Sequence, residues 1–106
     1  MKNILSSLLF LFSFTFLIED SFAQDSAFYY ESGMAKQEIK DYKGAIVDFN
    51  KAIKLETNEE LLSYVYYARG STKAFSGNME GACEDFVTSS RLGYEYADEM
   101  YRTFCE

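Results

Sequence analysis

A short pattern of residues, Gly-Ala-x-x-Asp-Phe, occurs twice in this chain and constrains its fold more than any other feature. The first copy begins at Gly44 and the second at Gly81, about 37 residues later. The matches extend over two segments of helical character in each copy, and they include glycines, which chance similarity between amphipathic helices rarely matches. The sequence therefore predicts a true internal repeat. The matched pairs include Tyr29 with Tyr66, Gly33 with Gly70, Lys36 with Lys73, Ala45 with Ala82, Asp48 with Asp85 and Phe49 with Phe86.

Each copy is predicted to form two helices joined by a turn. In the first copy these are residues 26–39 and 42–55, and Ala45, Phe49 and Ala52 give the second of them an apolar stripe that faces a core. In the second copy the helices are expected over about 60–76 and 79–92, with a turn at 77–78. Gly93 is expected to end the last of these in the left-handed conformation.

A fifth helix is predicted from about residue 95 to 105. Ala97, Met100, Tyr101 and Phe104 recur there at helical spacing. A final helix that covers the exposed end of a stack is what repeat proteins need.

These residues resemble the tetratricopeptide repeat, a helix–turn–helix unit of about 34 residues. The resemblance rests on Tyr29 and Gly33 in the first copy, on their counterparts in the second, and on the small-aromatic-small series that begins at Ala45. It implies an all-α fold of helix–turn–helix repeats: two repeats, about 26–59 and 63–96, plus a C-terminal capping helix, in a short right-handed α-solenoid. The sequence of these repeats is similar to that of small exported bacterial members of the family.

The chain departs from the family pattern at several positions. Ser32 and Arg69 stand where Leu is usual, and Lys36 and Lys73 stand where Tyr is usual. The helix-ending Pro is absent from both copies. The spacing exceeds the family period by about three residues, which we expect to be taken up around residues 59–62.

Residues 1–23 have the layout of a secretory signal peptide. Lys2 precedes an apolar stretch over residues 4–18, and Ser21 and Ala23 provide small residues before a cleavage site after Ala23. A membrane anchor is the alternative, but the apolar run is shorter than the roughly 20 residues that span a bilayer. We expect a mature domain of residues 24–106, exported to the periplasm or secreted from a bacterium, with no stable membrane anchor after cleavage.

Composition argues against catalysis and nucleic-acid binding. The formal net charge is −7, which repels phosphate backbones, and the chain has no His to serve as a general base or metal ligand. We therefore expect no enzyme activity, no catalytic residues, no cofactor and no metal. The recurring Asp48 and Asp85 are interpreted as solvent-facing or helix-pairing carboxylates, with partner contact as the alternative. Lys36 and Lys73 could hold carbonyls or carboxylates between helices.

Cys83 stands where the first copy has Ile46, on the face that should meet the next unit. That unit is the terminal helix, which carries Cys105. In an oxidising compartment the two thiols are predicted to form a disulfide, which by loop-closure entropy contributes roughly 3 kcal/mol. The alternative is two buried, unpaired thiols.

The resemblance also implies a partner-binding face, because the first helices of such repeats line the concave side of the stack. Tyr is enriched at interfaces, and several tyrosines occur at these positions. We expect a non-catalytic module that binds a protein or peptide through this face; a homo-oligomeric structural role is the alternative, and some of these rings could instead complete a small core. The candidate residues are Tyr30, Met34, Gln37, Glu38, Tyr64, Tyr67, Ser71 and Phe75.

Overall fold

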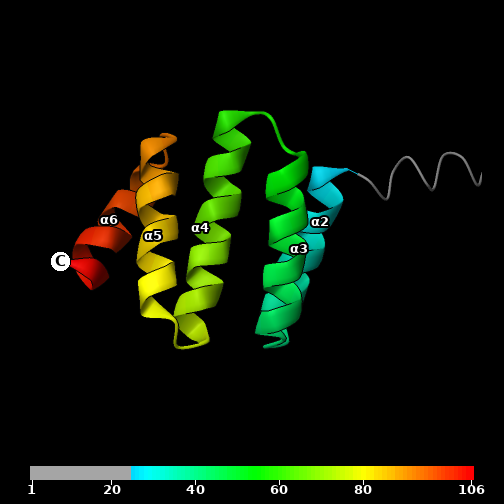
Figure 1. Ribbon diagram of the computed structural model, residues 1–106, viewed down its shortest axis with the longest axis horizontal. Coiled ribbons are helices and arrows are strands. Elements are labelled where there is room, and N and C mark those ends of the chain that lie inside the picture. The colour runs from blue at the N-terminus through cyan, green and yellow to red at the C-terminus, as the bar shows by residue number, and fades with distance from the viewer. Residues whose placement is uncertain (1–24) are drawn as a thin grey trace, which may run out of the picture.

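The computed structural model describes residues 25–106, so the predicted signal peptide lies outside the described residues. The described part of the chain folds into helices without a strand, which confirms the all-α prediction. Figure 1 shows these helices side by side, with α2 behind α3 and then α4, α5 and α6 in chain order. The helices are α2 (Ser26–Glu38), α3 (Tyr42–Leu55), α4 (Glu59–Phe75), α5 (Met79–Arg91) and α6 (Glu95–Cys105).

In the two helix pairs, α2 with α3 and α4 with α5, the second helix begins in the same way. Asp41 accepts a hydrogen bond from the backbone N–H of Gly44 at 3.0 Å, and Asn78 accepts one from Gly81 at 3.0 Å. Each side chain thus satisfies an amide at the start of the second helix that has no partner inside the helix. Before α4, by contrast, the longer spacing appears as extra helix: α4 has 17 residues and α2 has 13.

The turns between helices use left-handed backbone conformations. Gly93 has φ of 109°, as predicted, and Gly77 has φ of 94°. Lys40, at the position equivalent to Gly77, has φ of 66° despite its side chain. The first turn therefore uses a residue type that is strained in this conformation, whereas the second uses glycine.

The core repeats the same contact in each helix pair. A Cβ atom on Gly33 would lie 2.6 Å from a ring carbon of Phe49, and one on Gly70 would lie 3.1 Å from a ring carbon of Phe86. Both rings are fully buried or nearly so. A side chain at Gly33 would therefore force the Phe49 ring to move, and one at Gly70 would make a tight contact with the Phe86 ring.

The recurring aspartates are buried between helices. Asp48 is 5% exposed and accepts from Ser32 at 2.6 Å, and the Nζ of Lys36 lies 2.9 Å from it. The interpretation of these aspartates as solvent-facing carboxylates is therefore wrong, and their interpretation as helix-pairing carboxylates is confirmed. The departures from the family pattern at Ser32 and Lys36 therefore supply the partners of a buried carboxylate, which is costly to bury unpaired.

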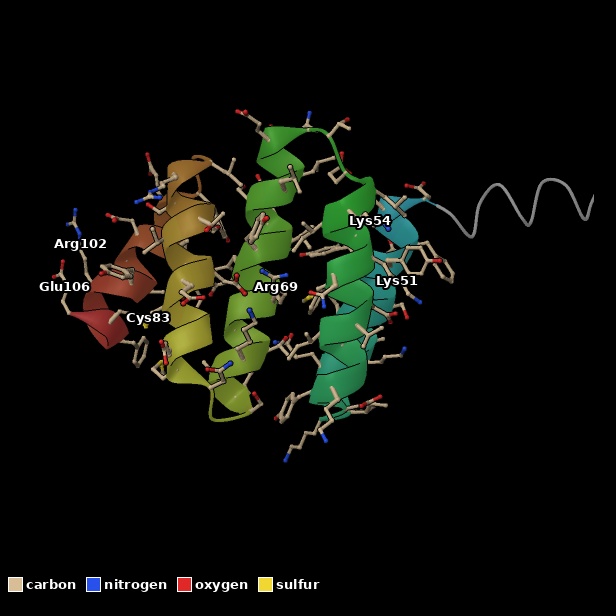
Figure 2. The ribbon with its side chains drawn as sticks, in the orientation of Figure 1. Lys51, Lys54, Arg69, Cys83, Arg102 and Glu106 are labelled. Carbon is tan, nitrogen blue, oxygen red and sulfur yellow. A yellow bond between two sulfur atoms is a disulfide. The ribbon has the colours of Figure 1, made fainter. Side chains whose placement is uncertain are left out.

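The second pair has the same arrangement with an arginine in place of the serine. Arg69 donates to Asp85 from Nε at 2.9 Å and from Nη2 at 2.7 Å, and Lys73 lies 3.0 Å from the same carboxylate. Arg69 also donates to Asn50 on α3 at 2.8 Å. In Figure 2 Arg69 projects from α4 on the side toward α3, so its guanidinium connects the two helix pairs.

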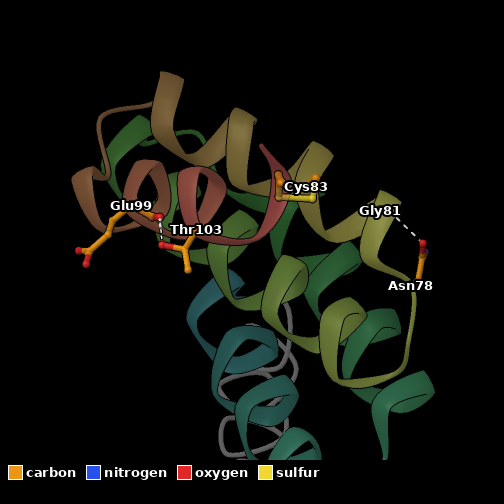
Figure 3. The surroundings of a disulfide bond; sticks show 6 residues. Asn78, Gly81, Cys83, Glu99 and Thr103 are labelled. Carbon is orange, nitrogen blue, oxygen red and sulfur yellow. Dashed lines mark hydrogen bonds between the residues drawn. A yellow bond between two sulfur atoms is a disulfide. The ribbon is translucent and has the colours of Figure 1, made fainter.

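A disulfide between Cys83 and Cys105 joins α5 to the last residue of α6 (Figure 3). Helix α6 has a single fully buried side chain, Ala97, and its C-terminal residues Arg102 to Phe104 are exposed. The covalent bond thus joins α5 to the less buried C-terminal end of α6.

Candidate functional site

A groove runs between α2 and α4 and ends against the turn between α5 and α6. It has a volume of about 160 Å³, and we call it the tyrosine groove. Its lining comes from one face of each of the two helices, because the positions recur at helical spacings of three and four. The groove is lined by Tyr30, Met34, Gln37, Tyr64, Tyr67, Ala68, Ser71 and Tyr94.

Most of the residues predicted for a partner-binding face meet in this groove. Those from α2 are Tyr30, Met34 and Gln37. Those from α4 are Tyr64, Tyr67 and Ser71. The first helices of the two pairs thus both contribute to the lining of one groove, and Ala68 adds a further residue from α4.

Two predicted residues lie elsewhere. Glu38 is exposed and does not line the groove, because it follows Gln37 by one residue and so points about 100° away around the helix. Phe75 is 67% exposed, and its ring stacks on Tyr42 of α3 with 6.2 Å between centroids. It lies one turn beyond Ser71, past the end of the groove.

The prediction missed Tyr94, which forms the wall of the groove at its α5–α6 end. Its ring lies edge-to-face against both Tyr64 and Tyr67, with centroids 5.1 Å apart in each case. The backbone is held by a hydrogen bond from Tyr94 N–H to the carbonyl of Ser89 at 3.1 Å, as part of the turn at Gly93. The sequence showed that turn but not that it directs the next side chain back toward α4.

Two tyrosines of the groove, Tyr30 and Tyr67, occupy equivalent positions in the two helix pairs. Tyr30 packs on Phe49 at 6.1 Å between centroids, and Tyr67 packs on Phe86 at 5.7 Å. Burial, together with the nearby Tyr94, raises the pKa of Tyr30, and burial is also the main cause of the raised pKa of Tyr67. Both phenols are therefore protonated at neutral pH and able to donate hydrogen bonds.

A smaller apolar pocket of about 100 Å³ shares Tyr30 and Tyr64 with the groove. Glu56 is its charged residue, but that carboxylate accepts hydrogen bonds from Ser26 Oγ and from the backbone N–H groups of Thr57 and Asn58. Its charge is thereby engaged within the protein. The groove and this pocket form two adjoining depressions lined mainly by aromatic and aliphatic atoms.

The lining of the tyrosine groove consists of aromatic, aliphatic, amide and hydroxyl side chains. None of its lining residues carries a charge. Within residues 25–106 there is no cluster of three His, Cys, Asp or Glu side chains that could hold a metal ion. No helix in that part of the chain is both long and apolar enough to cross a membrane.

Comparison with known proteins shows which repeat family the chain is similar to. The tetratricopeptide repeat family matches residues 26–59. A relative, the photosystem I assembly protein Ycf3 of Acaryochloris marina (strain MBIC 11017), is 31% identical over 84 residues, which cover 79% of this chain and 51% of the relative. The chain thus spans about half the length of the curated relative that it matches. No solved structure matches significantly.

Residues 26–59 match the tetratricopeptide repeat family, and the relative is similar over most of this chain. The paired helices and the glycine–aromatic contact of the matched segment recur in the second helix pair, as a helical repeat requires. Members of this family are generally non-catalytic modules for protein–protein interaction.

Proposed function

We propose that this protein is an exported, non-catalytic interaction module whose tyrosine groove binds a peptide segment of a partner protein. The observation that carries the proposal is the convergence of tyrosines from both helix pairs and from the α5–α6 turn on one uncharged groove. Tyrosine buries a large area at a low cost in conformational entropy and keeps a polar tip, so it is well suited to such contacts.

Export is part of this proposal. It is supported by the signal-like pattern of residues 1–23 and by the Cys83–Cys105 disulfide, since disulfides persist mainly in oxidising compartments. Expression of the full-length chain in a bacterial host, followed by intact-mass measurement of the protein from the periplasm and medium, tests it. The expected mass is that of a chain beginning at Gln24; an intact leader on protein confined to the cytoplasm would contradict export.

The groove is tested by selecting peptides from an unbiased phage-displayed library on the purified protein. Selected peptides are expected to bind Tyr67→Ala at least tenfold more weakly than wild type, because Tyr67 lines the groove and packs against the Tyr94 ring that forms its wall. Phe75→Ala is the matched control, since it also removes an aromatic ring from α4 but outside the groove. Circular dichroism confirms that both variants are folded. Failure of any peptide to enrich, or equal binding by Tyr67→Ala, would contradict the proposal.

Self-association is a second candidate role, and one observation favours it. The side chains of Ile39 and Phe75 are 75% and 67% exposed, although both are large and apolar. Both lie at the helix ends next to the turns within the two pairs, which are at the same end of the molecule (Figure 1). Light scattering during size-exclusion chromatography distinguishes the roles: a dimer that Phe75→Asp converts to a monomer supports self-association, and a monomeric wild type excludes it.

A further inference from the structure

We propose that the tyrosine groove takes a proline-rich segment in the polyproline II conformation. This inference rests on the proposed function and specifies the chemistry of the partner at the same site. It follows from comparing the groove with the recurring ways in which proteins recognise peptides.

The groove does not fit recognition by strand addition or by charge. Strand addition needs an exposed sheet edge, and residues 25–106 contain no strand. Acidic and phosphorylated motifs, and free C-terminal carboxylates, are bound by cationic side chains or by backbone amides. No Lys or Arg lines the groove, and its walls are the sides of two helices whose backbone amides bond internally.

An amphipathic helix is also a poor fit. Such partners place rows of aliphatic anchors into wide hydrophobic grooves. The tyrosine groove is about 160 Å³ in volume, and its apolar side chains other than tyrosine are Met34 and Ala68. It does not offer the aliphatic lining for that mode.

Polyproline II segments match what the groove provides. They are recognised by aromatic-lined grooves, and they lose little entropy on binding because their conformation is preformed. Proline has no backbone N–H, so such a segment presents carbonyl oxygens that need donors. The protonated phenols of Tyr30 and Tyr67 are donors, and no carboxylate in the groove lining competes for them.

The arrangement of rings supports the same ligand. Tyr94 stands at 87° to both Tyr64 and Tyr67, so the aromatic rings of the groove meet edge to face. Prolyl rings pack in aromatic-lined grooves of this kind. The adjoining apolar pocket beyond Tyr30 and Tyr64 provides a second depression for a neighbouring turn of the same segment.

Isothermal titration with an acetylated and amidated octaproline peptide tests the inference on the exported protein. A Ser-Ala octapeptide of equal length with the same blocked ends is the control ligand. Octaproline is expected to bind at least tenfold more tightly than the control peptide. Tyr67→Ala and Tyr94→Ala are each expected to weaken octaproline binding at least tenfold, and Phe75→Ala to change it less than twofold.

Tyr67→Phe covers the case in which Tyr67→Ala fails to fold. It keeps the ring packing on Phe86 and removes the hydroxyl, so weaker octaproline binding by a variant with unchanged circular dichroism supports donation to prolyl carbonyls. Octaproline binding that is unaffected by all of the groove variants would overturn the inference.

The outcomes for the two proposals are separable. If the selected library peptides lack proline and bind through Tyr67 while octaproline does not bind, the inference fails and the proposed function stands. If neither library peptides nor octaproline bind through the groove tyrosines, both fail.

Discussion

The carboxylate of Asp85 on α5 accepts hydrogen bonds from both Nε–H and Nη2–H of Arg69 on α4. The Asp85 side chain is 4% exposed and the Arg69 side chain 19% exposed. Hydrogen bonds between charged groups in this geometry are among the strongest in proteins. Because Arg69 also donates to Asn50 on α3, one side chain connects three helices.

Asp85→Ala is expected to lower the free energy of unfolding by about 3 kcal/mol, because it leaves the partly buried Arg69 and Lys73 without their counter-charge. Urea denaturation followed by circular dichroism measures the change. Asp98→Ala is the control: its ion pair with Arg102 is largely exposed, so the loss there should be under about 0.5 kcal/mol. Equal losses in both variants would show that Asp85 contributes no more to stability than an exposed ion pair does.

Stability should fall in acid, partly through Asp48. Burial alone would raise the pKa of Asp48, but hydrogen bonds from Ser32 and Lys36 outweigh it, and the pKa is lowered. The contribution of Asp48 is therefore present above the unfolded-state pKa of about 4 and is lost as the pH falls through the folded-state pKa. A hydrogen bond from Ser26 lowers the pKa of Glu56, which acts in the same direction.

Urea denaturation at pH 7, 5 and 3 measures this dependence. The free energy of unfolding should change little between pH 7 and 5 and then decrease toward pH 3. The free energy of unfolding of Asp48→Asn should be lower than that of wild type at pH 7. It should also decrease less than that of wild type between pH 5 and 3, since residue 48 no longer titrates. If the free energy of unfolding of Asp48→Asn decreased in acid as much as that of wild type, the pH dependence would come from other carboxylates.

Reduction of the Cys83–Cys105 disulfide should lower the free energy of unfolding by about 3 kcal/mol, since the bond closes a loop with a sequence separation of 22. Urea denaturation with and without dithiothreitol, a two-electron dithiol reductant, measures the loss. The Cys83→Ser, Cys105→Ser double variant should resemble the reduced protein and should not respond to the reductant. Alkylation of both thiols in unreduced, denatured protein would contradict the bond.

Lys40→Gly should stabilise the protein by roughly 0.5 to 1 kcal/mol. Lys40 has φ of 66°, a left-handed conformation that strains a residue with a Cβ atom and that glycine adopts freely. The reverse change at the equivalent turn, Gly77→Lys, should destabilise by about 1 kcal/mol. Thermal unfolding of the two variants checks both signs, and a shift of the same sign in both would refute this account of the turns.

Much of the fold follows from the sequence because it depends on local patterns that occur twice. The helical spacing of Ala45, Phe49 and Ala52 and the small residues at Gly33 and Gly70 are each visible without coordinates. The sequence left open whether Asp48 and Asp85 face solvent or pair helices, and the structure buries both. Their burial depends on partners 12 to 16 residues away on another helix, which come together only when the helices pack.

The sequence by itself determined the helices, their order and the face of α2 and α4 that carries most of the tyrosines, because periodicity and repetition are properties of the chain. The tertiary structure decided which of those side chains share a groove. Glu38 and Phe75 are excluded by their angle around the helix and their position along it, and Tyr94 is included because the left-handed Gly93 reverses the chain. A helical pattern defines a face, but a groove also needs the wall that another segment supplies.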